Sequence, residues 1–496
     1  MTPARRARVG NASAQEFAVD LHHLLKQLDE IGLVYQRAKG PTLLSAWQKD
    51  GQCLANPYYM RSNCAQACSI PSCVGYKKQS LPWKGYATEY HTKQYATRLP
   101  GVQGLGADRH FKRDASMGDI VPGHNMRGDP WLTLSTLGIG TYLGAEDIET
   151  DEQVAAAVIT SVQQGWNVID AASNYRGGRG ERAIGYALTA LHEQLGLTRE
   201  MLFISTKAGF LQDEVKHQLL KSRDIAEGDM IGGSSCLHPA CLQASLKQSL
   251  QSLRVNTVDL LYLHNPAEMQ LGPLGSQAFM QCLGKAFTWA EGARNKGLIR
   301  AYGLATWDCF RKAPGSAGYL SLLSIVQLAQ QVGGVDHGFR YVQLPINVAM
   351  PEAWRDKWQP MPIAMPLPDA EVVTESMGSL VEAAGKLQLG IFASGPLQEA
   401  ALLQSAALQS KLDIIAELSN IKGTGPKLIQ IARSTPGIVA TLELVCVEDI
   451  TDLWHNSTDT FLDISQLAFG GFCSTTIHCL RLKPQKLPFR QPIMEN

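Results

Sequence analysis

The chain has 496 residues, of which 45% are hydrophobic and 18% are charged, an ordinary balance for a globular protein. Its 45 basic and 45 acidic side chains cancel, which argues against nucleic acid or an anionic membrane surface as a partner. No run of 18 apolar residues is present, so we expect a soluble protein without a membrane-spanning helix. The length suffices for several domains of roughly 100–200 residues, or for one barrel of about 250–400 residues with extensions.

The N-terminal region shows no sustained hydrophobic period. It opens with the basic stretch MTPARRARVGNASAQ, which is compatible with a plastid or mitochondrial transit peptide, but Asp20, Asp29 and Glu30 soon follow. We therefore favour a cytoplasmic location. Leucines at helical spacing predict a short helix around residues 17–36. The remaining composition, rich in Gly, Pro, Tyr and Lys, predicts a partly irregular or disordered extension over residues 1–130.

Eleven cysteines in a chain of this length do not indicate a disulfide scaffold. Four of them crowd into the N-terminal extension, with ten, three and four residues between them: Cys53, Cys64, Cys68 and Cys73. This spacing lacks the paired C-x₂-C knuckles of zinc sites, and the histidines show no ligand-like spacing either. We expect free or partly buried thiols in a reducing compartment, and no bound metal.

A different pattern begins near residue 131, where short apolar runs alternate with helix-like segments. The eight runs cover residues 137–143, 167–172, 202–208, 258–264, 300–306, 341–345, 389–394 and 438–445. Apolar strands that alternate with helices are typical of buried parallel strands, either in a closed (β/α)₈ barrel or in a large doubly wound sheet. We predict an α/β fold, a (β/α)₈ TIM barrel over residues 131–445, followed by a divergent C-terminal tail over 446–496.

Two of the intervening helices have recognisable end signals. Thr150 followed by Gln153 forms a capping-box pattern that predicts the start of one helix, and Gly165 predicts its end. Pro239 predicts the first turn of another helix. The apolar stripe of that helix consists of Leu242, Leu246, Leu250 and Leu253.

Two gaps between the predicted strands are longer than a plain loop and helix require. They cover residues 209–238 and 307–340 and contain Gly-rich stretches. Long loops that follow barrel strands lie on the face where barrel active sites form. We therefore expect these two segments to act as lids or as walls of a substrate site.

Polar side chains interrupt the apolar strands at their C-terminal ends. Asp170 ends the second strand, Lys207 the third and His264 the fourth, and Tyr175 follows Asp170 by five residues. Because this end of a barrel is its catalytic face, the four side chains should converge at one mouth. There the Tyr175 hydroxyl could donate a proton. The Lys207 ammonium, paired with the Asp170 carboxylate, would lower the pKa of this hydroxyl. A histidine could orient and polarise a substrate carbonyl, so that a developing alkoxide is protonated as hydride arrives.

Each of these residues also has a simpler interpretation. Asp170 could be a helix cap, and Tyr175 a packed loop aromatic. Lys207 could form a Schiff base, as in aldolases. His264 could be a hydrogen-bonded interior histidine. Only the joint placement of the four on consecutive strands favours a catalytic set.

The segments NVIDAASNYRGGRGERAIGYAL, LFISTKAGF and VDLLYLHNP strongly resemble the aldo-keto reductases, as do GLIRAYGLATW, YVQLPINVAMPE and RSTPG. The resemblance covers roughly residues 131–440. It implies an NADP(H) or NAD(H) cofactor that lies extended across the barrel mouth without a Gly-rich fingerprint. It also implies that Tyr175 is the general acid, that Lys207 and Asp170 tune its pKa, and that His264 orients the substrate carbonyl.

The same resemblance implies the cofactor contacts. Gln343 matches the family's carboxamide-binding glutamine, and Ser394 and Leu397 match the loop that lies over the pyrophosphate. The family's Ser-Asn pair after the fifth strand is Ala305-Thr306 in this chain, which leaves Thr306 as the only hydroxyl there.

A second departure from the family pattern follows RSTPG. Glu443 and Leu444 stand where the family has a Gly-containing loop, and Glu448 and Asp449 follow without a Lys or Arg. A carboxylate at this place would repel the 2′-phosphate of NADP, whereas it could bond a ribose hydroxyl of NAD. The choice between the two cofactors is left open.

These observations predict an NAD(P)H-dependent oxidoreductase that reduces an aldehyde or ketone to an alcohol, or works in reverse on an alcohol or sugar. The two departures and the long extension support an alternative, a non-catalytic aldo-keto-reductase-like module that senses cofactor or binds a protein. A Schiff-base lyase using Lys207 is a third hypothesis, but it does not account for Tyr175 and His264. The sequence identifies neither the small-molecule substrate nor the oligomeric state.

Overall fold

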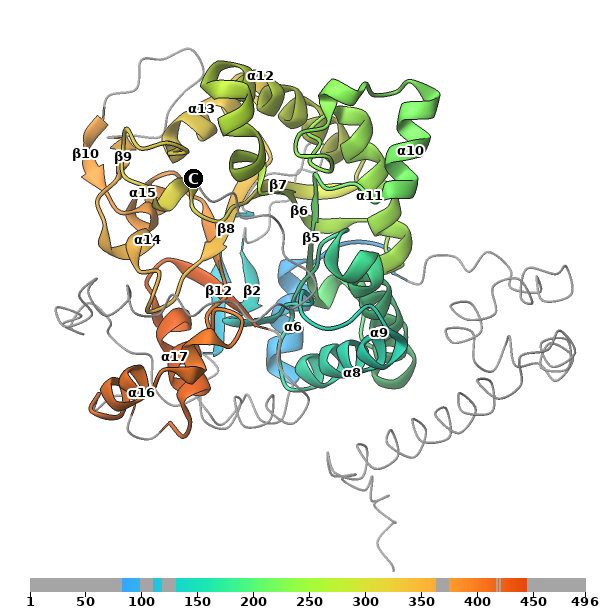
Figure 1. The fold of residues 1–496 in the computed structure, drawn as a ribbon. Helices are drawn as coiled ribbons and strands as arrows, with labels where there is room; N and C mark the ends of the chain where they lie inside the picture. Colours follow the sequence, from blue (N-terminus) through green and yellow to red (C-terminus); the bar gives the residue numbers. More distant parts are fainter. Residues whose placement is uncertain are drawn as a thin grey trace, which may run out of the picture. The chain divides into compact units, whose positions relative to one another are not determined.

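Eight parallel strands close into a barrel, and their order around it follows their order in the chain (Figure 1). In the computed structural model they are β3 (Leu137–Ile139), β4 (Val168–Asp170), β5 (Phe203–Ala208), β6 (Val258–His264), β7 (Ile299–Ala305), β8 (Phe339–Pro345), β11 (Gly390–Ser394) and β12 (Ile438–Glu443). Each coincides with one of the predicted apolar runs, so the (β/α)₈ barrel is confirmed. Closure of the sheet excludes the doubly wound alternative.

The structure describes residues 83–98, 110–117, 131–362, 374–415, 418 and 421–443. The chain divides between Ser80 and Leu81 into two units, and every described residue belongs to the second. The predicted helix at 17–36, the four clustered cysteines, the residues from Leu444 onward and the predicted tail therefore lie outside the described residues. None of the described helices has the length and hydropathy needed to cross a bilayer.

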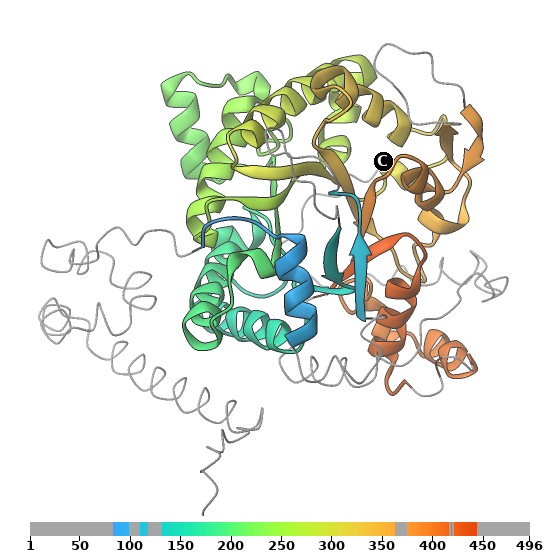
Figure 2. The ribbon, with the colours of Figure 1, turned by 180° about the vertical axis from the view of Figure 1, so that it is seen from behind.

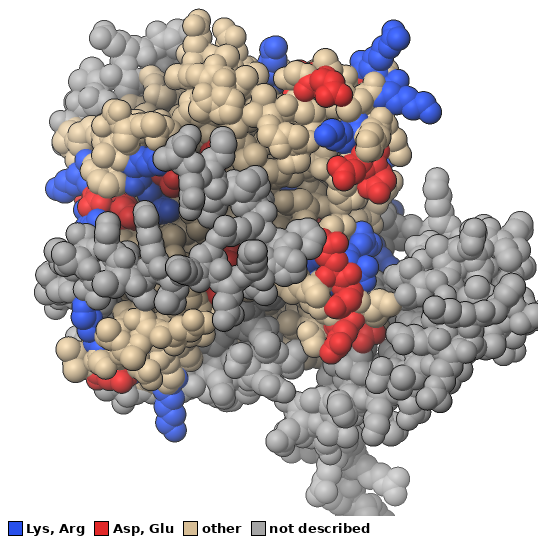
Figure 3. Space-filling view, viewed as in Figure 1, with Lys and Arg blue, Asp and Glu red and all other residues tan. Residues whose placement is uncertain are grey.

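Helices connect the barrel strands and surround them (Figure 1). The helices that lie between successive barrel strands include α8 (Ile148–Gln163), α9 (Arg179–Leu195), α11 (Pro239–Leu253), α12 (Pro266–Asn295), α13 (Leu322–Gly333), α15 (Leu380–Lys386) and α17 (Thr424–Ser434). The loops carry α10 (Asp213–Ser222), α14 (Glu352–Arg355), α16 (Ala406–Asp413) and the short strands β9 (Gln359–Pro362) and β10 (Thr374–Gly378). On the face in Figure 3, described acidic and basic side chains lie close to one another rather than in separate patches of one sign.

The two helix starts predicted from end signals have different outcomes. Pro239 is the first residue of α11, as predicted. The Thr150 capping box is wrong, because α8 begins earlier, at Ile148. Its N-cap is Asp147, whose carboxylate accepts a hydrogen bond of 2.8 Å from the Thr150 N–H. An aspartate with extended backbone at the N-cap satisfies this N–H, so Thr150 lies inside the first turn.

The two long loops also differ from expectation. The segment after β5 is a true excursion, which carries α10 before α11 begins. Much of the segment 307–340, in contrast, is α13 and the start of β8, so it is not an insertion of that length. The glycines that suggested a loop lie at the end of α13, where Gly334 is the C-cap with a φ of 72°. A glycine accepts this positive φ without steric penalty.

The side chains of the barrel strands alternate between its interior and the surrounding helices. On β6, Leu260 and Tyr262 pack with Phe203 and other interior residues. Leu261 and Leu263 pack instead in the cluster that includes the helices. This two-residue period, in which neighbouring side chains point to opposite faces, is what turns polar side chains at the strand ends toward the barrel axis.

The unit that contains the barrel begins at Leu81, earlier than the boundary near residue 131 that we expected. Strand β1 (Phe111–Asp114) pairs antiparallel with β2 (Leu132–Ser135), and Figure 2 shows α6 (Glu89–Arg98) in blue near the cyan β1. The Thr133 N–H donates to Thr92 Oγ1 of α6 at 3.0 Å. Leu132 and Leu134 join the interior cluster of the barrel. These elements therefore close the N-terminal end of the barrel, which we call the floor.

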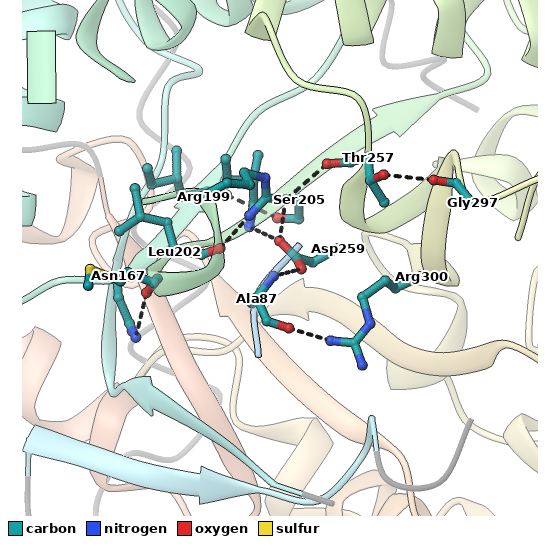
Figure 4. Close-up of polar contacts among 12 residues, drawn as sticks. Ala87, Asn167, Arg199, Leu202, Ser205, Thr257, Asp259, Gly297 and Arg300 are labelled. Carbon is teal, nitrogen blue, oxygen red and sulfur yellow. Dashed lines mark hydrogen bonds and ion pairs between the residues drawn. The ribbon is translucent and has the colours of Figure 1, made fainter. Parts of the chain in front are cut away.

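A buried ion pair ties the floor together (Figure 4). Arg199 Nη2 lies 2.6 Å from Asp259 Oδ2, and the side chains are 1% and 0% exposed. The carboxylate also accepts the N–H of Ala87 at 2.7 Å and that of Ile204 at 2.8 Å. On the other side of Ala87, Arg300 donates to its carbonyl oxygen at 2.5 Å. The segment that precedes α6 is thus hydrogen-bonded to two barrel strands, β6 and β7.

Replacing Asp259 with Asn should destabilise the fold strongly, because it leaves the Arg199 guanidinium buried without a counter-charge. We expect the free energy of unfolding to fall by about 3–5 kcal/mol in urea denaturation. The control is Asp356→Asn, which removes the partner of the half-exposed Arg355 and should cost at most about 1 kcal/mol. Equal losses in the two variants would contradict the role assigned to the floor pair.

Candidate active site

Four predicted site residues meet at the C-terminal mouth of the barrel. Asp170 ends β4, Lys207 is the penultimate residue of β5 and His264 ends β6. Tyr175 begins the 3₁₀ turn η1 (Tyr175–Gly178) that follows β4. Lys207 Nζ lies 2.5 Å from Asp170 Oδ2 and 4.6 Å from the centroid of the Tyr175 ring. The centroids of the Tyr175 and His264 rings are 5.8 Å apart, and the rings meet edge to face.

The Asp170 carboxylate is held on both oxygens. Oδ2 pairs with Lys207, while Oδ1 accepts from Ser205 Oγ at 2.6 Å and from Gln343 Nε2 at 3.0 Å. Lys207 also donates to the carbonyl oxygen of Ala171 at 2.8 Å. Both charged side chains are almost completely buried, at 1% and 5% exposure. The helix-cap interpretation of Asp170 is wrong, since this carboxylate binds three side chains from two other strands, β5 and β8.

Burial and charge act in opposite directions on Tyr175. Burial raises the pKa of its hydroxyl above 10.0, the nearby Lys207 ammonium lowers it, and Asp170 raises it; the net shift is upward. The expected lowering by lysine is thus present, but desolvation of the phenolate outweighs it. For Lys207, burial alone would lower the pKa, but Asp170 and Tyr175 together raise it above its usual value. The lysine is therefore an ammonium at neutral pH.

His264 is a neutral imidazole. Burial, and then the neighbouring Lys207 cation, hold its pKa well below 6.5. Phe210, which follows β5, packs edge to face against it with the ring centroids 5.1 Å apart. A neutral histidine carries one ring N–H, which can donate a hydrogen bond to a carbonyl oxygen without adding a proton to it.

The predicted cofactor residues lie on the next strands around the barrel. Thr306 directly follows β7 and its N–H donates to the carbonyl oxygen of Gln343 on β8 at 2.8 Å. The buried Thr306 hydroxyl has no hydrogen bond of ordinary geometry within the described structure, although the Cys309 thiol lies near it. Ser394 ends β11 and is half-buried, as is Leu397 in the loop that follows. Glu443 ends β12, and its carbonyl oxygen accepts from the Gly140 N–H at 2.8 Å.

Sequence reasoning missed four residues that shape this mouth. Ser205 precedes Lys207 by two and therefore shares its face of β5, a signal that the strand period could have provided. Tyr142, 49% exposed, packs its ring 5.1 Å from that of Tyr175. Glu268 in the first turn of α12 accepts the N–H groups of Trp307, at 2.7 Å, and Asp308, at 2.9 Å. Phe210 had no sequence signal.

A disulfide holds the loop that carries Phe210. Cys236 and Cys241 are bonded and completely buried, with Leu211 and Ile225 packed around them in a small separate cluster. The Cys236 N–H donates to the carbonyl oxygen of Gly209 at 2.8 Å. The expectation of free thiols did not foresee this bond. Among the described residues, no group of three or more His, Cys, Asp or Glu could hold a metal ion.

Removing the disulfide should loosen this loop without melting the barrel. For a loop this short we expect the Cys236→Ser, Cys241→Ser double variant to lose about 2 kcal/mol of stability. Hydrogen exchange should accelerate over residues 209–238 and remain slow in β6 and β7. The control is Cys282→Ser, which removes a cysteine outside any disulfide. Unchanged exchange in the loop of the double variant would show that packing alone holds it.

Part of the sequence is similar to known proteins. A family model described as Aldo/keto reductase family matches residues 136–317. The methylglyoxal reductase DkgB of Salmonella typhi is 26% identical over 176 residues, 36% of this chain and 49% of the relative. The aldo-keto reductase family 1 member C13 of Mus musculus is 25% identical over 183 residues, 35% of this chain and 48% of the relative. The chain spans about half the length of the curated relatives it matches.

Solved structures were compared as well. An aldo/keto reductase from Klebsiella pneumoniae in complex with NADP and acetate has a TM-score of 0.46 and 17% identity, covering 68% of this chain and 90% of that one. The glycerol dehydrogenase of Gluconobacter oxydans has a TM-score of 0.47 and 16% identity, covering 77% and 100%. The segment 136–317 that matches the family model contains β3 to β7 and all four converging side chains. Through this segment, the chain is similar to the aldo-keto reductases.

Proposed function

We propose that this protein is an NAD(P)H-dependent reductase of aldehydes or ketones that also works in reverse on alcohols or sugars. The observation that carries the proposal is the convergence of Tyr175, Lys207 and His264 at the mouth, with Asp170 locked behind the lysine. The match of residues 136–317 to the aldo/keto reductase family model supports it. So does the relative named methylglyoxal reductase, whose name identifies a carbonyl compound as substrate.

The side chains divide the work of carbonyl reduction. A bound nicotinamide cofactor would supply the hydride. The neutral His264 would donate its ring N–H to the carbonyl oxygen and hold it near the hydroxyl of Tyr175. Tyr175 would then transfer its proton to the oxygen of the developing alcohol and recover one from solvent. The Lys207 ammonium would stabilise the phenolate left behind.

The residues at the mouth fit a nicotinamide cofactor. The buried Thr306 hydroxyl, which lacks a hydrogen bond of ordinary geometry in the described structure, could bind a carboxamide together with Gln343. Ser394 and Leu397 would contact the pyrophosphate. Because Gln343 also donates to Asp170, it would connect the cofactor to the catalytic ion pair. The choice between NADP and NAD depends on residues that follow Glu443.

The same geometry disfavours a Schiff-base lyase. An amine must be neutral to attack a carbonyl, whereas the Asp170 carboxylate keeps Lys207 protonated. The substrate would instead meet aromatic walls, since Tyr142 and Phe210 flank the catalytic tyrosine and histidine. These walls favour a carbonyl compound with an apolar group.

Binding and turnover of both cofactors test the proposal. NADPH and NADH are titrated by the quenching of tryptophan fluorescence, and turnover is followed with a nitrobenzaldehyde. We expect turnover with one cofactor at least, and a loss of roughly 10²–10⁴-fold in kcat for Tyr175→Phe with cofactor affinity retained. Cofactor binding without any turnover would favour the non-catalytic module. If Tyr175→Phe retains the turnover of the unaltered chain, Tyr175 is not the general acid.

The pH dependence tests the role of Lys207. Tyr175 must be protonated to act as an acid, so reduction should be level through neutral pH and decline only above the raised pKa of this hydroxyl. In Lys207→Met the cation that lowers this pKa is gone, so the alkaline decline should move to higher pH while kcat falls. The measurement is the pH–rate profile of both proteins. A decline that moves to lower pH would contradict the assignment.

A further inference from the structure

The turn that presents Tyr175 has an unusual backbone. The three residues after the tyrosine all have positive φ: Arg176 at 51°, Gly177 at 60° and Gly178 at 80°. The two glycines accept the left-handed region readily, but an arginine does not. A residue with a Cβ persists in this region only when its surroundings hold it there. The holding contacts should therefore be found on the Arg176 side chain.

Arg176 is anchored by three acceptors. Nε donates to the carbonyl oxygen of Ala145 at 2.8 Å, and Nη2 donates to the carbonyl oxygen of Asp147 at 3.3 Å and to Asp151 Oδ1 at 2.6 Å. The Arg176 and Asp151 side chains are 1% and 2% exposed. Asp151 lies in the first turns of α8, and it also pairs with Arg179, the first residue of α9, at 2.6 Å.

These contacts join the two loops whose aromatic rings meet at the mouth. The loop between β3 and α8 carries Tyr142 and supplies the carbonyl oxygens of Ala145 and Asp147. The turn η1 carries Tyr175, whose ring lies 5.1 Å from that of Tyr142. A displacement of Arg176 would therefore move the adjacent Tyr175 relative to Lys207 and to the substrate wall.

We propose that Arg176 and Asp151 are positioning residues for the general acid: their buried ion pair holds the left-handed turn that aims Tyr175 at the mouth. This inference rests on the proposed function, because it assigns the pair a role in that reaction. A merely structural pair would support the fold without influencing the chemical step.

The chain provides a matched control at the other end of the barrel. The floor pair Arg199–Asp259 has the same separation of 2.6 Å and nearly the same burial, 1% and 0% exposed. It binds the segment before α6 rather than the turn that carries Tyr175. Loss of either arginine should destabilise the fold, but only loss of Arg176 should affect the chemical step.

The experiment compares Arg176→Met with Arg199→Met in the full chain. Both should unfold at lower urea concentration. Activity is measured below the unfolding temperature and expressed per folded molecule. For Arg176→Met we expect kcat to fall by roughly 10–100-fold, because a small misplacement of a catalytic group has effects of this size. The cofactor affinity of this variant should not change. Its alkaline decline should also move to higher pH, as in Lys207→Met, because Tyr175 loses contact with Lys207. Arg199→Met should retain the kcat and the pH profile of the unaltered chain.

Two further substitutions of Arg176 separate the effect of backbone strain from the effect of losing the side-chain hydrogen bonds. Arg176→Gly removes the anchor but accepts the positive φ, so it should be more stable than Arg176→Met and equally slow. It also serves as the test variant if Arg176→Met fails to fold. Arg176→Lys keeps a charged donor toward Asp151 and should recover part of kcat.

The outcomes are distinguishable from those of the proposed function. If the unaltered chain reduces a carbonyl substrate and Tyr175→Phe does not, the proposed reductase function stands. A normal kcat and pH profile in both Arg176→Met and Arg176→Gly would then overturn the positioning role alone. An equal loss of kcat in Arg199→Met would overturn it too, since the effect would then be general destabilisation. If the unaltered chain reduces no carbonyl, the proposed function fails, and the positioning role fails with it.

Discussion

The chemistry proposed for this barrel depends on one buried ion pair, Lys207 with Asp170. Removing both charges from water is costly, and the pair persists because the carboxylate accepts from Ser205 and Gln343 while the ammonium also donates to a backbone carbonyl. The result is a fixed positive charge at the mouth. Burial, assisted by this charge, holds the pKa of His264 low and the imidazole neutral, while the charge opposes the rise that burial imposes on the pKa of Tyr175.

The two ends of the barrel use similar interactions for different purposes. At the floor, the pair Arg199–Asp259 and the hydrogen bonds of Ala87 connect the segment before α6 to the strands. At the mouth, the pair Arg176–Asp151 supports a turn with unfavourable backbone geometry beside an exposed aromatic ring. At the mouth, these contacts hold a turn that a residue with a Cβ adopts only under constraint, whereas at the floor they hold a segment to the barrel strands.

The loop after β5 adds a wall to the site. Its disulfide, its small apolar cluster and the hydrogen bond from Gln212 Nε2 to the carbonyl oxygen of Ser173 connect it to the loop that leads to Tyr175. Phe210 from this loop then packs on His264. The residues that would recognise a substrate are thus supported from outside the barrel, while those proposed for the chemical step are supported from within it.

Much of this protein could be predicted from local sequence patterns. Eight apolar runs with helices between them indicate a parallel α/β sheet, and closure into a barrel is seen in the structure. The positions of Lys207 and His264 at the ends of their strands predict that they lie at the mouth of such a barrel. Pro239 marks a helix start because its fixed φ acts locally. Other features were beyond sequence reasoning. The N-cap of α8, the bond between Cys236 and Cys241, the left-handed Arg176 and the upward pKa shift of Tyr175 all depend on which distant groups surround a residue. Burial and long-range contacts decide them, and only the tertiary structure supplies both.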